Sequence, residues 1–433
     1  MIRRRTLLAA TAASAATLAA PAIARAQAMK LSFYYPIAVG GPIPAIIDGY
    51  CKAFHAETGI EVTPVYAGNY GETLTKAVTA IKGGSGPQLA VLLAAEMHSL
   101  QDLDILASLD EIGGLEGDGK AWLGGFYPAF LANSVVDGKT WSVPFQRSTA
   151  IMYYNKTAFT EAGLDPEKFP LTWAELGAAA EKLTKRDASG RVTRWGVKMA
   201  SDVGNAQWTF GAIANQAGHV LMNQAGTETY FNDPKAIEGM AYWRGLASVH
   251  HATPEGITGW PALSPDFLEG NAAIIQHTTG NLTNLRSNAK FPFGVAGLPG
   301  KTGPRTVVGG GNIYFFKQAS PAERAAALKF ARFLTEPARA ADWSIQTGYI
   351  AVRPDAYQTP ALRDYVIHYP PADVARGFLP VAVGELSTFQ NQRVYQALTN
   401  NIQACLSGKL TPQQAMVNTQ AEADRILKPY KRG

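Results

Sequence analysis

Three strand-like segments separated by two helical segments occupy residues 30–93, and this order constrains the fold more than any other feature. Residues 30–35 and 60–66 have strand composition, and residues 89–93 form a continuous apolar run of strand length. Between them, apolar residues recur at helical spacing in 43–54 and 74–81. Strands that alternate with helices are typical of a sheet with helical crossovers. The sequence therefore predicts an α/β fold.

The same alternation resumes further along the chain. The capping box Thr172–Glu175 predicts a helix that runs towards Lys185. Further strands are expected at 141–145, 150–154, 195–200, 272–276 and 312–316, and further helices at 234–249, 321–347 and most of 392–428. No internal repeat and no long polar linker divides the chain, so two α/β lobes with several chain crossings fit better than two domains in series.

The N-terminus has the three parts of a secretory signal peptide. Arg3, Arg4 and Arg5 precede an apolar stretch, which ends in the small-residue exit 24–26. The apolar stretch is too short to span a bilayer. Residues 1–26 are therefore expected to be removed from an exported, periplasmic protein. Paired arginines before Leu7 and Leu8 suit the twin-arginine route, and ordinary Sec export remains open.

The charge balance argues against nucleic-acid binding. The chain has 39 basic and 34 acidic residues. Four of the basic residues are signal arginines, which leaves 35 against 34 in the mature chain. Such a chain has no basic field for nucleic acid or lipid headgroups. No apolar run after the signal reaches membrane-spanning length.

Two cysteines, Cys51 and Cys405, lie in helix-like segments at opposite ends of the chain. In an oxidising compartment they could form a disulfide, or both could be buried as small apolar residues. The sequence leaves both alternatives open.

Recognisable catalytic patterns are missing. The seven histidines and two cysteines form no zinc-binding spacing, and neither a P-loop nor a G-x-S-x-G motif occurs. We therefore expect no metal, no cofactor and no enzyme activity. The rival interpretation, a secreted phosphoester hydrolase, needs a metal cluster or a nucleophile–base pair, and nothing selects one. Gly309–Gly311 is interpreted as a turn where the backbone closely approaches another group.

Eight segments carry a resemblance to a known family. They are GNYGETL (68–74), PFQRSTAIMYYNKTAFTEAGLDP (144–166), TWAEL (172–176), FNDPKAI (231–237), FLEGNAAI (267–274), TTGNL (278–282), VVGGGNIYF (307–315) and TGYIAV (347–352). In this order they resemble the extracellular solute-binding family that includes maltose-binding protein. The GNY, ST, GG and TGY pieces resemble its glycerol-phosphate-binding branch, whose members serve ABC importers.

The resemblance implies two lobes joined by a hinge, with the ligand in the cleft between them. Hinge bending would close the lobes on the ligand. The first lobe would comprise residues 27–143 with 291–341, and the second 144–290 with 342–433. The implied partners are a small-molecule ligand and an inner-membrane ABC permease, and the implied state is a monomer.

The resemblance also implies a ligand site. It places Tyr70, Ser148, Thr278, Gly310 and Tyr349 in the cleft, where hydroxyl and amide donors suit a phosphate ester. Trp208 would form an apolar floor beneath the glycerol. Each has an ordinary structural alternative: the tyrosines and Trp208 as packing aromatics, Ser148 and Thr278 as turn residues.

Three departures from the family pattern bear on the ligand. Ala94 stands where the family has a glutamate, with Glu96 two residues later, and a second cleft tryptophan is missing near Gly204 and Asn205. The phosphate-binding arginine has no clean match, and Arg393 and Arg147 are the two candidates. The cleft is therefore expected to be larger than is usual in the family. The expected ligand is sn-glycerol 3-phosphate or a related glycerophosphodiester. The alternative is a sugar receptor whose Trp208, Tyr70 and Tyr349 stack against sugar rings.

Overall fold

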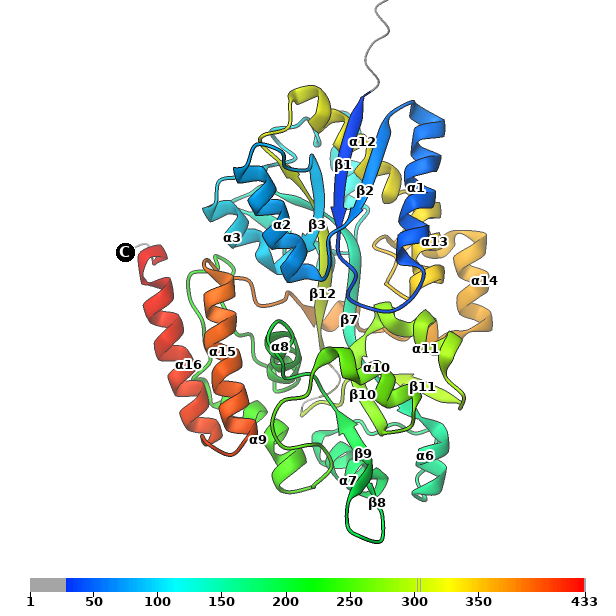
Figure 1. Ribbon diagram of the computed structural model, residues 1–433, viewed down its shortest axis with the longest axis vertical. Helices are drawn as coiled ribbons and strands as arrows, with labels where there is room; N and C mark the ends of the chain where they lie inside the picture. The colour runs from blue at the N-terminus through cyan, green and yellow to red at the C-terminus, as the bar shows by residue number, and fades with distance from the viewer. Residues whose placement is uncertain (1–28, 302, 304, 432–433) are drawn as a thin grey trace, which may run out of the picture.

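Two lobes joined by long strands make up the protein in this computed structural model, which describes residues 29–301, 303 and 305–431 (Figure 1). The predicted signal peptide, residues 1–26, lies outside the described residues. One sheet runs through both lobes in the strand order β2-β1-β3-β12-β7-β10-β9-β8. Its middle strands cross from one lobe to the other, so the chain passes between the lobes several times.

The first lobe begins with the predicted alternation of strands and helices. Strand β1 (Lys30–Tyr35) pairs in parallel with both β2 (Glu61–Tyr66) and β3 (Leu89–Leu93). Helix α1 (Ile43–Thr58) ends at Gly59, whose φ of 73° is the left-handed conformation that glycine adopts freely. Helix α2 (Tyr70–Lys82) begins at a capping box between Asn69 and Glu72. All five elements agree with the sequence-based prediction.

The connecting strands are β7 (Ser142–Asn155) and β12 (Thr306–Phe316), which pair in antiparallel orientation. Strand β12 pairs on its other side with β3. Every residue of β7 is buried. The prediction of two strands, at 141–145 and 150–154, is wrong: the polar stretch between them continues the ladder, with Arg147 opposite Gly310 and Thr149 opposite Val308.

The second lobe contains the other half of the sheet. Strand β10 (Ala272–Thr278) pairs antiparallel to β7 and parallel to β9 (Val192–Lys198). Its main helices are α7 (Trp173–Leu183), α8 (Ala206–Gln216), α9 (Pro234–Ser248), α15 (Asn391–Leu406) and α16 (Pro412–Leu427). The capping box between Thr172 and Glu175 is present as predicted.

The helix expected over 321–347 is two helices, α12 (Pro321–Leu334) and α13 (Pro337–Thr347). Proline has no amide hydrogen and sterically restricts the residue before it, so Pro337 ends one helix and begins the next. Through Trp343, α13 stacks on Phe145 with ring centroids 4.9 Å apart, and Asp342 accepts a 2.6 Å hydrogen bond from the Tyr50 hydroxyl of α1. These contacts hold α13 against the core of the first lobe.

Shorter elements complete the described part of the chain. The helices are α3 (Met97–Asp102), α4 (Gly119–Gly124), α5 (Pro128–Leu131), α6 (Lys156–Glu161), α10 (Trp260–Leu268), α11 (Leu282–Asn288) and α14 (Pro360–His368). The strands are β4 (Leu106–Ala107), β5 (Val135–Val136), β6 (Lys139–Thr140), β8 (Lys185–Arg186), β11 (Phe293–Ala296) and β13 (Ala382–Val383). The 3₁₀ turns are η1 (Ala94–Glu96), η2 (Thr279–Asn281), η3 (Pro354–Gln358), η4 (Pro370–Ala372), η5 (Arg376–Val381) and η6 (Lys428–Tyr430).

The two cysteines belong to different apolar clusters. Cys51 is buried in the cluster around α1, and Cys405 in the one around α15. Both thiols are free. Of the two alternatives that the sequence left open, the structure has buried thiols.

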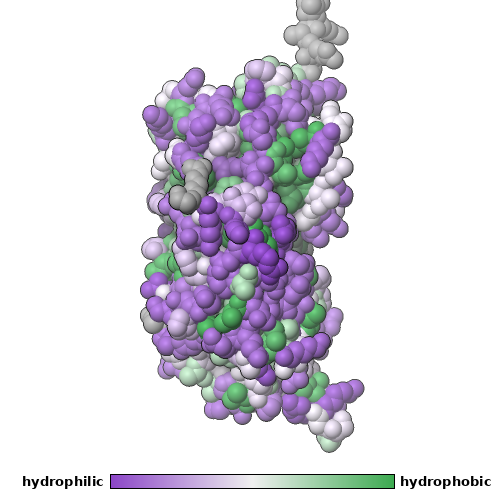
Figure 2. All heavy atoms as spheres, turned by 90° about the vertical axis from the view of Figure 1, so that its left-hand side faces the viewer, coloured by the Kyte–Doolittle hydropathy of each residue, from purple (hydrophilic) through white to green (hydrophobic). Residues whose placement is uncertain are grey.

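The outer surface on the α16 side is covered largely by hydrophilic residues, with hydrophobic ones in small groups (Figure 2). Within the described residues, no helix has the length and apolar character needed to cross a membrane.

Candidate ligand-binding cleft

A cavity of about 740 Å³ lies between the lobes, within the usual range for a small-molecule site. The first lobe lines it with the β1–α1 loop, residues 37–40, and with the start of α2, residues 69–71. The second lobe contributes residues 202–208 and helix α10. The connecting strands and the chain leading into α15 complete the lining, so both lobes and their connections build the site.

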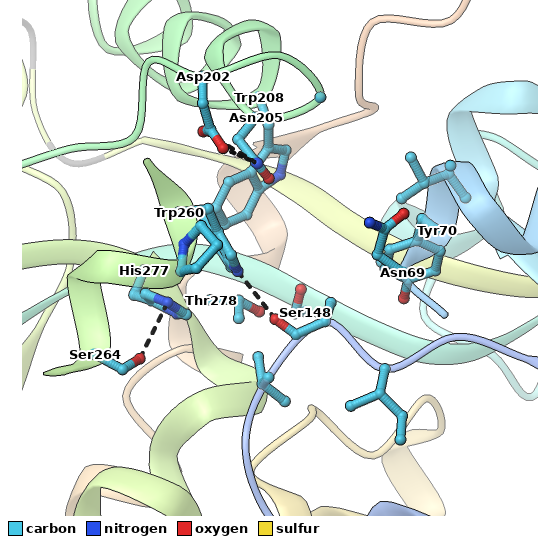
Figure 3. Close-up of a pocket in the computed structure, with 18 of the residues that line it drawn as sticks. Asn69, Tyr70, Ser148, Asp202, Asn205, Trp208, Trp260, Ser264, His277 and Thr278 are labelled. Carbon is cyan, nitrogen blue, oxygen red and sulfur yellow. Dashed lines mark hydrogen bonds between the residues drawn. The ribbon is translucent and has the colours of Figure 1, made fainter. Parts of the chain in front are cut away.

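Six of the eight predicted site residues line this single cavity. They are Tyr70, Ser148, Trp208, Thr278, Gly310 and Tyr349. In Figure 3, Tyr70 lies at the right and Trp208 in the upper centre, with Ser148 and Thr278 below Trp208. The fold therefore brings together six residues that are spread over 280 positions of sequence.

The Gly309–Gly311 segment belongs to strand β12, so the predicted turn is wrong, whereas the predicted close backbone approach is present. A Cβ at Gly309 would lie 2.5 Å from the Trp208 indole nitrogen, and one at Gly310 would lie 1.9 Å from the carbonyl oxygen of Gln146. Gly310 also has a φ of 92°, which other residues rarely adopt. Because these residues have no side chain, β12 can pass directly beneath a wall of aromatic rings that includes Trp208.

That wall is formed by two tryptophans and a histidine. Trp208 and Trp260 meet edge to face with centroids 5.8 Å apart, and Trp260 lies over His277 at 4.0 Å. The Trp208 indole donates to the carbonyl of Val308 at 3.3 Å, and the Trp260 indole donates across the cleft to the carbonyl of Ala38 at 2.9 Å. Burial lowers the pKa of His277 to about 3, so its ring is neutral at pH 7.

The two candidate arginines differ in position. Arg147 is completely buried, and its Nη1 donates to the carbonyl of Gly310 at 3.0 Å. Arg147 thus lies just behind a lining residue without itself lining the cavity. Arg393 is on the exposed side of α15 and is not among the lining residues. The predicted contact from Arg393 is therefore not supported, because the α15 residues that line the cavity are Gln392 and Tyr395.

Two carboxyl groups line the cavity. They belong to Asp202 and Glu385, and no described lining residue is a lysine or arginine. Burial raises the pKa of Glu385 to about 8, against the opposing effect of the Arg147 charge. Asp202 accepts from the Asn205 side chain at 3.2 Å.

Two helix N-termini border the cavity. Tyr70 and Gly71 begin α2, and Gln207 and Trp208 belong to the first turn of α8; all four line the cavity. The α2 terminus carries its own capping box and the Glu72 carboxylate, whereas no side chain caps α8. Because an uncapped helix N-terminus favours a nearby anion, the α8 terminus is the one suited to an anionic ligand.

The departures from the family pattern also have a place in the structure. Gly204 and Asn205, where the second tryptophan is missing, line the cavity. Ala94 and Glu96 are buried in η1 outside the lining. Glu96 Oε1 accepts from Gln392 at 2.6 Å and from Asn391 at 3.3 Å, so it connects the lobes behind the cleft.

Sequence reasoning missed four lining residues that stand out in the structure: Trp260, His277, Asp202 and Glu385. Glu385 lies in the segment GELSTFQNQRVYQAL (384–398), where an arginine was sought. Trp260 had no periodic pattern around it, because its helix has only nine residues and contains Pro265. Local pattern alone offered no means of finding these four.

Two α/β lobes around a solute-sized cleft define a receptor of the periplasmic-binding-protein class. The family model of bacterial extracellular solute-binding proteins matches residues 49–370, and the chain belongs to this family. Members are receptors that bind a small solute for an ABC permease and are not enzymes, so this chain is an extracytoplasmic solute receptor.

Curated relatives and solved structures agree with this assignment. The chain is 26% identical to the sn-glycerol-3-phosphate-binding periplasmic protein UgpB of Escherichia coli O6:K15:H31, over 97% of this chain and 98% of that protein. It is 27% identical to UgpB of Yersinia pseudotuberculosis, over 90% and 91%. UgpB of Mycobacterium tuberculosis in complex with glycerophosphocholine has a TM-score of 0.81 at 23% identity, covering 93% of this chain and 99% of that one. Maltose-bound Thermotoga maritima MalE3 has a TM-score of 0.78 at 22% identity, covering 92% and 100%.

Proposed function

We propose that this protein captures a glycerophosphodiester in the periplasm and delivers it to an ABC permease. The observation that carries the proposal is the uncapped N-terminus of α8, which borders the same cleft as the hydroxyl groups of Ser148 and Thr278. Amide and hydroxyl donors around one cavity suit a phosphate oxygen. The relatives named for sn-glycerol 3-phosphate support a ligand of this type.

The charge of the cleft favours a diester over the phosphate monoester. A diester carries one negative charge, whereas a monoester carries nearly two at neutral pH. The lining offers the carboxyl groups of Asp202 and Glu385, and Glu385 keeps its proton for the most part at neutral pH. No described lining residue is a lysine or arginine, and the Arg147 guanidinium lies behind Gly310. A single negative charge is balanced by the α8 N-terminus and one buried cation more easily than two. The missing tryptophan near Gly204 leaves room for the second ester group.

The remaining expectations fit the same proposal. The signal peptide, residues 1–26, supports a periplasmic location, and we propose that the mature receptor is a monomer. We keep the predicted lobe division with one change. Helix α13 is assigned to the first lobe, because Asp342 accepts a hydrogen bond from Tyr50 of α1 and the rings of Trp343 and Tyr50 lie with centroids 6.5 Å apart.

Titration calorimetry with the purified mature protein tests the ligand. The panel is sn-glycero-3-phosphocholine, sn-glycerol 3-phosphate, inorganic phosphate and maltose. We expect the diester to bind at least about tenfold more tightly than the monoester, a difference of about 1.4 kcal/mol. Tighter binding of the monoester would contradict the charge argument, and binding of maltose alone would contradict a phosphate ligand.

Two arginine variants sharpen the test. Arg393→Ala should leave binding of the diester unchanged, because Arg393 is exposed on α15 outside the lining. Arg147→Lys keeps a charge near Gly310 but removes the guanidinium, and it should weaken the diester more than maltose. Equal losses for both ligands would show that Arg147 acts only on the fold.

A sugar receptor is the second candidate, favoured by one specific feature. Trp208, Trp260, Tyr70 and Tyr349 present aromatic rings to the cavity, and aromatic faces pack well against the apolar faces of sugar rings. Maltose in the same panel decides between the two candidates.

A further inference from the structure

The loop between β1 and α1, residues 36–42, borders two cavities. One side of it lines the ligand cleft with residues 37–40. The other side, residues 40–42, lines a smaller cavity of about 110 Å³ together with α11 and the end of α13. In Figure 1 the loop lies directly above α10 and α11. The loop therefore closes one end of the cleft, at a place where the two lobes meet.

Two side chains of the second lobe contact this loop. Trp260 of α10 donates a hydrogen bond from its indole Nε1 to the carbonyl of Ala38 at 2.9 Å. Gly40 lies so close to Asn284 of α11 that a Cβ at position 40 would be 2.8 Å from Asn284 Oδ1. Between them, Val39 is buried in an apolar cluster that also contains residues of α10. Protein groups make these contacts on both sides, so the contacts need no ligand to bridge the lobes.

Each side of this contact is held in place. The Ile37 amide donates to the carbonyl of Gly68 at 3.0 Å, which fixes the start of the loop. Helix α11 is fixed by the Thr283 hydroxyl, which donates to the carbonyl of Ile345 in α13 at 3.2 Å. Because α13 belongs to the first lobe, this bond also joins the lobes. The loop therefore meets a rigid surface, and its contacts with α10 and α11 can hold at the same time.

We propose that residues 38–40 form a latch with Trp260 and Asn284 that holds the two lobes together, and that opening of this latch limits the rate at which a ligand enters the cleft. When protein contacts stabilise a closed state, only a fraction of the molecules is open, and the apparent association rate is reduced by that fraction. The latch goes beyond the proposed function, because it acts on any ligand that the cleft binds.

Stopped-flow fluorescence with sn-glycero-3-phosphocholine tests the hydrogen bond of the latch. Trp260→Phe keeps an aromatic ring and removes the indole donor. Both the association and the dissociation rate should rise about 2- to 12-fold, the factor equivalent to one hydrogen bond of about 0.5–1.5 kcal/mol. Trp173→Phe is the matched control, because Trp173 donates to Gln216 at 2.6 Å within the second lobe and does not line the cleft. It should leave both rates unchanged.

The association rate is the decisive readout of this experiment. Loss of a ligand contact alone would change mainly the dissociation rate. An unchanged association rate in Trp260→Phe would therefore overturn the latch.

A disulfide tests the close approach at Gly40. A Cβ at position 40 would lie 2.9 Å from Asn284 Cγ, the place that Sγ takes in a cysteine, so the double variant Gly40→Cys/Asn284→Cys suits a disulfide. Oxidation should slow association of the ligand at least about tenfold, and dithiothreitol should restore it. The controls are the reduced double variant and Asn284→Cys alone. A disulfide that does not form, or that forms without slowing association, would overturn the latch.

Small-angle scattering separates failure of the latch from failure of the proposed ligand, because it needs no ligand. The free wild-type protein should have the same radius of gyration as the oxidised double variant, and a larger radius in the wild-type protein would overturn the latch. If sn-glycero-3-phosphocholine does not bind, the phosphodiester proposal fails, and the rates are measured with maltose. If neither ligand binds, the comparison of the two radii decides on the latch alone.

Discussion

The buried carboxyl group of Glu385 should make the stability of the ligand-free protein depend on pH, and Glu385→Gln should remove that dependence. Burial raises the pKa of Glu385 to about 8, from 4.5 for an unperturbed glutamate. Between pH 4.5 and pH 8 the folded protein therefore holds a proton that the unfolded chain has lost. The stabilisation that the protonated Glu385 gives the folded protein is fully present below pH 4.5. It decreases as the pH rises from 4.5 to about 8, and it changes little above that pH.

The magnitude follows from the shift. Each pKa unit corresponds to about 1.36 kcal/mol, so the shift from 4.5 to about 8 is worth about 5 kcal/mol in total. About 4 kcal/mol of this falls between pH 5 and pH 9. Glutamine has a similar shape and does not ionise, so the Gln variant should gain about 4 kcal/mol relative to the wild-type protein over that interval.

Urea unfolding at pH 5, 7 and 9, followed by circular dichroism, measures this difference. Glu255→Gln, a change at an exposed glutamate, is the matched control and should track the wild-type protein at every pH. Glu96→Gln should show a smaller gain, since burial raises the pKa of Glu96 only to about 7. A Glu385→Gln difference that stays constant within about 1 kcal/mol from pH 5 to pH 9 would refute the reasoning.

Three further outcomes are expected. Gly310→Ala should lower the free energy of unfolding, measured by urea titration, by more than about 2 kcal/mol. The new Cβ would lie 1.9 Å from the Gln146 carbonyl oxygen, and the backbone at this position has a φ of 92°. An unchanged free energy of unfolding would contradict the close approach. Trp260→Phe removes the 2.9 Å hydrogen bond to Ala38 across the cleft and should cost about 0.5–1.5 kcal/mol. It should also raise the radius of gyration in small-angle scattering, and an unchanged radius would count against a cross-cleft contact. Cys51 and Cys405 should react with a thiol reagent only in urea, since burial raises the pKa of Cys51 to about 12; rapid labelling of the native protein would contradict their burial.

Local structure followed from short stretches of sequence. The apolar spacing of 43–54 predicted α1, and the capping box at Thr172 predicted the start of α7. These features depend on residues within one or two helical turns of each other. The error at Pro337 was also local, since a proline that begins a new helix was missed inside a periodic pattern.

Long-range pairing decided what local pattern could not. The polar stretch 146–149 has no strand signature, and it continues β7 only because Gly309 and its neighbours on β12 supply the hydrogen-bond partners. Resemblance to a family placed six residues in the cleft, and the structure brings those six together. It could not choose between Arg147 and Arg393.

The character of the cleft was likewise a product of tertiary structure. Trp260, Asp202 and Glu385 line the cavity because α10, the start of α8 and the segment before α15 meet there, although these segments are up to 180 residues apart. The sequence by itself determined an α/β solute receptor, because periodicity, caps and motifs are local. The tertiary structure decided the polarity of the site, because that polarity depends on which distant side chains the crossing strands bring to one cavity.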